Sequence, residues 1–171
     1  LWHHLLHRRF DGIVINVGRT VGKSPEALLQ TLCTDSTYGT LDYFLYGRSS
    51  RSPFKVDIID RENLSFLIDG FPVKILNRER NPYHLNWKDE NVRIVIDCTG
   101  KFLDPTVSDA EGKGDLRGHL AAGAQKVIVS APFKIKKELP HYHESFPTMI
   151  YGINHLDYQP IHQHIISAAS C

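Results

Sequence analysis

Several features that would assign this chain of 171 residues to other classes of protein are missing from it. No apolar run approaches the roughly 20 residues that a membrane-spanning helix needs, and the first nine residues lack the apolar core of a signal peptide. The 20 Lys and Arg residues nearly balance the 19 Asp and Glu residues. Because nucleic acids and membrane surfaces are bound by concentrated basic faces, we expect neither as a partner. We expect a cytoplasmic protein.

Cysteine is scarce, and its spacing is uninformative about metals or disulfides. The three residues Cys33, Cys98 and Cys171 form neither a disulfide framework nor a zinc knuckle, which is consistent with a reducing compartment. The ten histidines include pairs such as His141 and His143, which could place two imidazoles on one face. No third ligand stands at a fixed spacing, so we expect no metal site.

The glycine patterns of nucleotide-binding loops are absent or incomplete. No Gly-x-Gly-x-x-Gly occurs anywhere in the chain. The segment Gly18–Ser24 imitates a P-loop but has three residues between its glycines where that motif has four, and the ring of backbone amides around a phosphate depends on the loop length. Ser24 and Pro25 suit the N-cap and first turn of a helix over residues 27–33, which is the role we expect.

The sequence does contain short apolar strands alternating with helical segments. Strands are predicted at 13–17, 92–97, 126–129, 149–154 and from Ile165 onward, and helices at 1–9, 27–33 and 116–124. Three further strands, at 55–60, 64–68 and 71–76, are separated by polar turns, including Asp69-Gly70, and predict an antiparallel hairpin insert. The pattern predicts an α/β fold with a mainly parallel sheet and right-handed crossovers.

The last seven residues, Ile165–Cys171, run from an apolar β-branched pair into small residues and stop on a cysteine. A thiol at the carboxyl end of a parallel strand can have its thiolate stabilised by the N-terminus of the helix that follows. The residues alone leave a second reading open, in which Cys171 is a small buried hydrophobic residue.

Five segments, in the same order, resemble the phosphorylating glyceraldehyde-3-phosphate dehydrogenase family. They are Asp35–Gly39, Asp97–Phe102, His119–Ala124 leading to Val129–Pro132, Tyr151–Asn154 and Ser167–Cys171. The resemblance implies that residues 1–171 are an incomplete Rossmann-type NAD(P)-binding domain with helices on both faces of its sheet. It also implies that the first strand and its Gly-rich loop are missing, and that the catalytic domain would follow Cys171.

The resemblance implies oxidation of glyceraldehyde 3-phosphate to 1,3-bisphosphoglycerate through a cysteine thioester, with hydride transfer to NAD(P). Cys171 is the implied catalytic residue, and Ser170 would lie near the attacking phosphate. The implied cofactor-binding residues are Asn16, Arg80, Cys98, Thr99, Gly100, Phe102, Ser130 and Ala131. Plainer roles stay open for Arg80 as a surface charge, for Phe102 as a core aromatic and for Ser170 as a small packed residue.

The expected cofactor is NAD, with NADP also tolerated. Val17 stands where the family has an acid that binds the adenosine ribose, and Arg19, Thr20 and Lys23 follow it. Loss of a carboxylate and gain of cations would relieve repulsion of a 2′-phosphate. An ordinary basic surface loop is the alternative.

None of the histidines matches the family's catalytic base, so we expect the isolated chain to be inactive and its phosphorylated aldehyde substrate to need the missing domain. The resemblance also implies a homotetramer for the full-length protein. Two alternatives remain: the sister activity on erythrose 4-phosphate, and a non-catalytic binding or assembly module derived from the enzyme.

Overall fold

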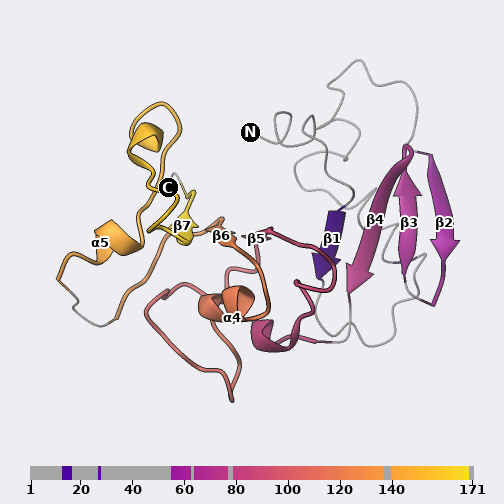
Figure 1. Cartoon of the computed structure of the whole chain (residues 1–171), viewed down its shortest axis with the longest axis horizontal. Coiled ribbons are helices and arrows are strands. Elements are labelled where there is room, and N and C mark those ends of the chain that lie inside the picture. The colour runs from indigo at the N-terminus through magenta and orange to yellow at the C-terminus, as the bar shows by residue number, and fades with distance from the viewer. Residues whose placement is uncertain are drawn as a thin grey trace. The chain divides into compact units, whose positions relative to one another are not determined.

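A computed structural model of the chain describes residues 13–16, 27, 55–62, 64–76, 79–136 and 140–169, with the backbone alone for residues 13–16 and 56. The chain divides into two compact units, Leu1–Arg78 and Glu79–Cys171, each with its own sheet (Figure 1). Among the residues described, no helix has both the length and the apolar character needed to cross a membrane.

The first unit holds a four-stranded sheet in the order β1-β4-β3-β2. Its strands are β1 (Ile13–Asn16), β2 (Val56–Asp60), β3 (Ser65–Ile68) and β4 (Phe71–Leu76). β2, β3 and β4 form an antiparallel meander, while β1 runs parallel to β4. The antiparallel insert predicted from the sequence is therefore confirmed.

The turn between β3 and β4 is formed by Asp69 and Gly70, as their sequence predicts. Both residues have positive φ, 50° and 79°, and this backbone matches the twist of the two strands that it joins. The Asp69 carboxylate accepts a 2.9 Å hydrogen bond from the Lys55 amide, and the Asp69 amide donates to the Lys55 carbonyl at 2.9 Å. These bonds hold the turn against the chain that leads into β2.

The core of the first unit follows from strand alternation. Phe66 and Ile68 of β3 are buried, as are Val73 and Ile75 of β4, whereas the intervening side chains are at least partly exposed. Burial of each such side chain contributes about 1.5–3 kcal/mol relative to leaving it in water.

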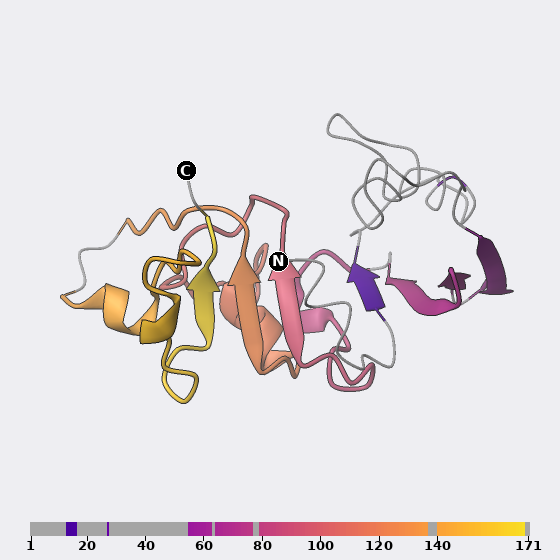
Figure 2. The ribbon, with the colours of Figure 1, turned by 90° about the horizontal axis from the view of Figure 1, so that it is seen from above.

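The second unit holds three parallel strands in the order β5-β6-β7. They are β5 (Ile94–Asp97), β6 (Lys126–Val129) and β7 (Ile165–Ser167), and Figure 2 shows them side by side and pointing the same way. The register aligns Asp97 with Val129 and Val129 with Ser167. The carboxyl ends of all three strands therefore lie along one edge of the sheet.

Helix α4 (Leu116–Ala121) connects β5 to β6, and the 3-10 helix η2 (Pro82–His84) packs against it. The Asp115 side chain caps α4 by accepting hydrogen bonds from the amides of Arg117 and Gly118. The core cluster consists of Leu116, Val127, Val129 and Ile165, which are all buried, with Phe102, Leu120, Ala131, Phe133 and Phe146 packed against it.

The strand predicted for residues 149–154 is wrong. Apart from one bridge between Thr148 and Ser167, this stretch is a turn, followed by the 3-10 helix η3 (His155–Asp157). Asn154 explains the difference, because its side chain accepts from the Ile150 amide at 2.7 Å and donates to the Thr148 carbonyl at 3.0 Å. A side chain that satisfies nearby backbone groups in this way competes with strand pairing. Helix α5 (Tyr142–Ser145) precedes this stretch.

Parallel strands joined through a helix, beside an antiparallel meander, confirm the predicted α/β, Rossmann-like fold. The described strands form two separate sheets.

Candidate functional site

The carboxyl edge of the β5-β6-β7 sheet brings together most of the candidate residues. Cys98, Thr99 and Gly100 follow β5, and Ser130 and Ala131 follow β6. Because the strands are parallel and in register, these two segments lie next to each other. Ligands of open parallel sheets bind outside this edge.

Backbone and hydroxyl hydrogen bonds fix the strand ends relative to one another. The Ser130 amide donates to the Asp97 carbonyl at 3.0 Å, which extends the pairing of β5 and β6 by one step. The Ser167 hydroxyl donates to the Ala131 carbonyl at 3.0 Å and accepts from the Ala169 amide at 3.3 Å. Ser167 is fully buried, so its hydroxyl connects the ends of β6 and β7 by hydrogen bonds that water does not reach.

The edge is open to a ligand at Gly100. This residue has a φ of +65°, and a Cβ placed on it would have no atom within 4 Å. Cys98, Thr99 and Ser130 are also exposed. A positive φ that suits glycine, together with free space around it, allows close approach of a flat or sugar-like ligand to the backbone.

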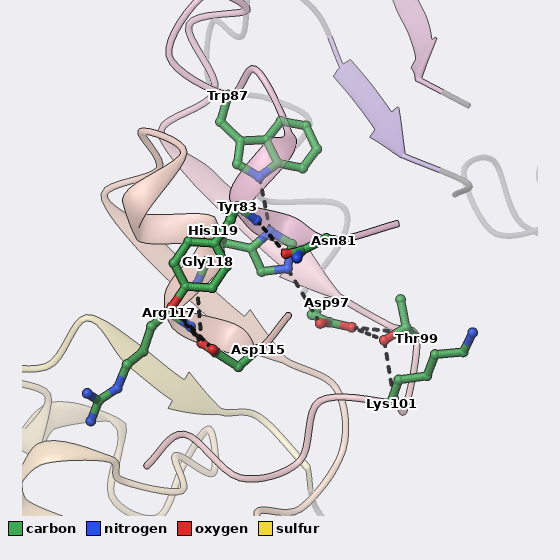
Figure 3. Close-up of polar contacts among 10 residues, drawn as sticks. All are labelled: Asn81, Tyr83, Trp87, Asp97, Thr99, Lys101, Asp115, Arg117, Gly118 and His119. Carbon is green, nitrogen blue, oxygen red and sulfur yellow. Dashed lines mark hydrogen bonds and ion pairs between the residues drawn. The ribbon is translucent and has the colours of Figure 1, made fainter. Parts of the chain in front are cut away.

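A chain of polar side chains runs from the buried Trp87, His119 and Asp97 to the exposed Thr99 at this edge (Figure 3). The Trp87 indole donates to His119 Nδ1 at 3.0 Å, and His119 Nε2 lies 3.6 Å from Asp97 Oδ2. The other oxygen of Asp97 accepts from the Thr99 amide at 2.8 Å and from the Thr99 hydroxyl at 2.6 Å. We call Trp87, His119, Asp97 and Thr99 the indole-to-threonine chain.

Burial by itself raises the pKa of the Asp97 carboxyl, but contact with the His119 imidazole and the two Thr99 donors outweighs this effect. The net result is a pKa below the ordinary value for aspartic acid. Asp97 is therefore a carboxylate at neutral pH, with its charge held at the end of β5.

Three other candidate residues lie away from this edge or in a different environment. Phe102 is half-buried and packs against the core cluster, and Arg80 is an exposed residue in the segment that leads into η2. Asn16 is the last residue of β1 in the first unit. Side chains that the structure does not describe are those of Asn16, Ser170 and Cys171, together with Val17, Arg19, Thr20 and Lys23 and the segment Asp35–Gly39.

Sequence reasoning missed the buried side chains behind the edge. Trp87 lies in a segment that carries no motif, and His119 is only the first residue of the segment His119–Ala124, to which no role had been assigned at that residue. One signal was present in the sequence: Asp-x-Thr at the end of an apolar strand is a typical side-chain-to-backbone turn. Nothing in the spacing indicates that His119 would meet that aspartate.

The edge offers exposed hydroxyl groups and open backbone at Gly100, and it holds a carboxylate beneath them. Such a surface suits a ligand rich in hydroxyl and amide groups, such as a nucleoside. Within the described ranges, no group of three or more His, Cys, Asp or Glu residues is arranged to hold a metal ion.

No protein-family model matches the sequence. Among curated proteins, the chain is similar to glyceraldehyde-3-phosphate dehydrogenase A, chloroplastic, of Chlamydomonas reinhardtii, with 33% identity over 171 residues, which is 99% of this chain and 36% of that protein. Glyceraldehyde-3-phosphate dehydrogenase B, chloroplastic, of Pisum sativum is 32% identical over 170 residues, 99% of this chain and 30% of that protein. The glyceraldehyde-3-phosphate dehydrogenase of Streptomyces coelicolor is 38% identical over 104 residues, 61% of this chain and 26% of that protein.

The chain thus spans about a third of the length of the curated relatives that it matches. The family resemblance predicted from the five segments is confirmed by these similarities.

Proposed function

Since this chain is a relative of the glyceraldehyde-3-phosphate dehydrogenase family, we propose that it is the nucleotide-binding part of such an enzyme. The observation that supports the proposal most is the carboxyl edge of the β5-β6-β7 sheet. There the exposed Thr99, the open Gly100 and the exposed Ser130 are brought side by side by the strand register.

The bound group would be a nicotinamide dinucleotide, which supplies a hydride acceptor when it is present. The residues at the edge fit its nucleoside part, because they are small, hydroxylated and exposed.

The proposed reaction begins at Cys171. Its thiolate would add to the carbonyl carbon of glyceraldehyde 3-phosphate and form a thiohemiacetal. The thiohemiacetal would become a thioester by giving its hydride to a bound oxidised nicotinamide and its hydroxyl proton to a base. Inorganic phosphate attacks the thioester carbonyl, near Ser170, and the thiolate leaves as 1,3-bisphosphoglycerate forms. Sulfur suits both steps, because it attacks strongly and leaves readily from a thioester.

Titration of the chain with NAD and with NADP tests the binding proposal. We expect saturable binding, weakened by Ser130→Val, which places a branched side chain at the edge. A stably folded chain that binds neither nucleotide would favour the second candidate function, a binding or assembly module that no longer uses a cofactor.

Coenzyme preference is tested by the double variant Arg19→Ala, Lys23→Ala. If these cations relieve repulsion of a 2′-phosphate, the variant loses affinity for NADP more than for NAD. An equal loss for both nucleotides would mean that NADP tolerance does not rest on these two residues.

Turnover is tested with glyceraldehyde 3-phosphate or erythrose 4-phosphate, NAD and inorganic phosphate. We propose that the isolated chain forms no NADH with either aldehyde, because no histidine matches the family's base. Activity of the chain alone would contradict this, and its preferred aldehyde would distinguish the triose enzyme from its erythrose counterpart.

Assembly and location are also part of the proposal. We propose a homotetramer for the full-length protein and a cytoplasmic location. The proteins that are similar to this chain include both chloroplastic and glycosomal enzymes, so they occupy several compartments.

A further inference from the structure

The hydrogen-bond roles in the indole-to-threonine chain are determined by its first member. An indole N–H can only donate, so His119 Nδ1 must accept the 3.0 Å bond from Trp87. In the neutral imidazole the proton then sits on Nε2, which is the nitrogen facing Asp97 Oδ2 at 3.6 Å. This separation is too long for a hydrogen bond, so the two buried polar atoms face each other in an electrostatic contact, and neither has a hydrogen-bond partner in the described part of the chain.

The same reasoning determines what Thr99 can offer to a ligand. A carboxylate can only accept, so the Thr99 hydroxyl donates its proton to Asp97 over 2.6 Å. One of its lone pairs accepts from the Lys101 amide at 3.2 Å. The remaining capacity of the exposed hydroxyl is to accept one more hydrogen bond.

We propose that Asp97 and His119 are positioning residues for the Thr99–Gly100 turn, and that they make Thr99 an acceptor for a hydroxyl or amide donor of the ligand. The ligand half of this inference rests on the function proposed above. It assigns a ribose or carboxamide group to the end of β5, because a phosphate oxygen has no proton to give to Thr99 and would meet the charge of Asp97.

The chain contains a natural control for this arrangement. Asp104 accepts from the Thr106 amide at 2.9 Å and from the Thr106 hydroxyl at 2.6 Å, which are the same bonds that Asp97 makes with Thr99. Asp104 is only partly buried, and its second oxygen accepts from the Lys136 amide rather than contacting a histidine. A comparison of the two turns therefore distinguishes the effect of the Asp–Thr hydrogen bonds, which both turns have, from the effect of the buried histidine contact, which only the Thr99 turn has.

The experiment measures amide hydrogen exchange at Thr99 and Thr106 in the free chain, and the dissociation constant for NAD. His119→Leu leaves Asp97 Oδ2 buried beside an apolar group, whereas His119→Gln keeps an N–H close to the position of Nε2. We expect His119→Leu to speed exchange at Thr99 by about tenfold, since removing the polar group that faces a buried charged oxygen costs at least that much. His119→Gln should change it less than about threefold, and both variants should leave Thr106 unchanged.

Affinity should follow the same order. We expect His119→Leu and Thr99→Val to weaken NAD binding by about tenfold, and His119→Gln and Thr99→Ser to retain it. Asp104→Asn should speed exchange at Thr106 without changing either Thr99 exchange or NAD affinity. Inorganic sulfate, which has no proton at neutral pH and can only accept, should not protect the Thr99 amide.

Two results would overturn the positioning role: Thr99 exchange that is unchanged in folded His119→Leu, or a His119 proton found on Nδ1 in a nitrogen-15 spectrum of the unmodified chain. The spectrum decides the matter if His119→Leu does not fold. Failure of the unmodified chain to bind NAD, with Thr99 protected as expected, would instead count against the proposed function and the ligand half of the inference.

Discussion

Replacing Gly118 by alanine tests how closely α4, the helix behind the candidate site, packs against η2. Gly118 precedes His119 and is buried against η2. A Cβ at this position would lie 2.7 Å from Tyr83 Cδ2, 2.9 Å from Pro82 Cβ and 2.9 Å from the Tyr83 backbone nitrogen. Since carbon atoms pack best at about 3.5–4.0 Å, these contacts are short by roughly 0.6–1.3 Å.

Two effects of opposite sign set the expected magnitude. Alanine favours a helix over glycine by about 1 kcal/mol, whereas overpacking a buried position costs about 1–3 kcal/mol. The clash involves a proline ring and a backbone nitrogen, neither of which can rotate away. The overpacking cost should therefore lie in the upper part of its range, and after subtraction of the helix term we expect Gly118→Ala to lower the free energy of unfolding by about 1–2 kcal/mol.

Gly112→Ala is the matched control. Its added Cβ would lie even closer to a neighbour, 2.2 Å from an oxygen of Asp109, but that atom ends a side chain that can rotate at the cost of its exposed 3.0 Å hydrogen bond from the Lys113 amide. We expect a loss of about 0.5 kcal/mol for this exposed position, less than for Gly118→Ala.

Urea unfolding of both variants provides the measurement. In a Trp2→Phe background, the emission of Trp87 also reports the indole bond to His119, which should change when α4 moves away from η2. If the Gly118→Ala chain had a free energy of unfolding equal to or above that of the unmodified chain, the close packing of α4 on η2 would be refuted.

Three further outcomes are expected from the described side chains. The pKa values of Asp97 and Asp104 lie below the ordinary range in the folded chain, so the unfolded chain takes up protons first as pH falls. The free energy of unfolding measured in urea should therefore be fully retained above about pH 5 and decline below about pH 4. This decline should be smaller in the double variant Asp97→Asn, Asp104→Asn. Leu116→Ala, at a fully buried core position, should cost about 2–5 kcal/mol by the same assay, and Leu116→Met less than about 1.5 kcal/mol. Asn154→Ala should speed proteolytic cleavage within 148–154 while lowering global stability by only about 1 kcal/mol, and unchanged cleavage would show that its two bonds do not hold the turn.

Local patterns were sufficient to predict the elements themselves. Asp69-Gly70 between two alternating apolar segments predicted the hairpin turn, because few residue pairs other than these adopt positive φ twice without strain. Continuous apolar runs predicted the parallel strands β5 and β6, and the crossover helix between them began where the sequence indicated. Residues 149–154 misled the same reasoning, since a β-branched, aromatic composition was outweighed by one asparagine side chain.

The candidate site was predictable in part. The motifs identified Thr99, Gly100 and Ser130, and the strand register places them on one edge. Cys171 and Ser170 lie beyond the described residues, so their roles stay predictions.

The sequence alone determined the α/β class, the hairpin and the family to which the chain is similar, because these depend on periodicity, turn chemistry and motifs that are local in the chain. Only the tertiary structure decided that Trp87, His119 and Asp97 meet behind the Thr99 turn. The indole and the imidazole are separated by 32 residues, and their contact depends on α4 packing closely on η2 at Gly118. Contacts of this kind arise from the way elements pack together, and no single segment of sequence carries that information.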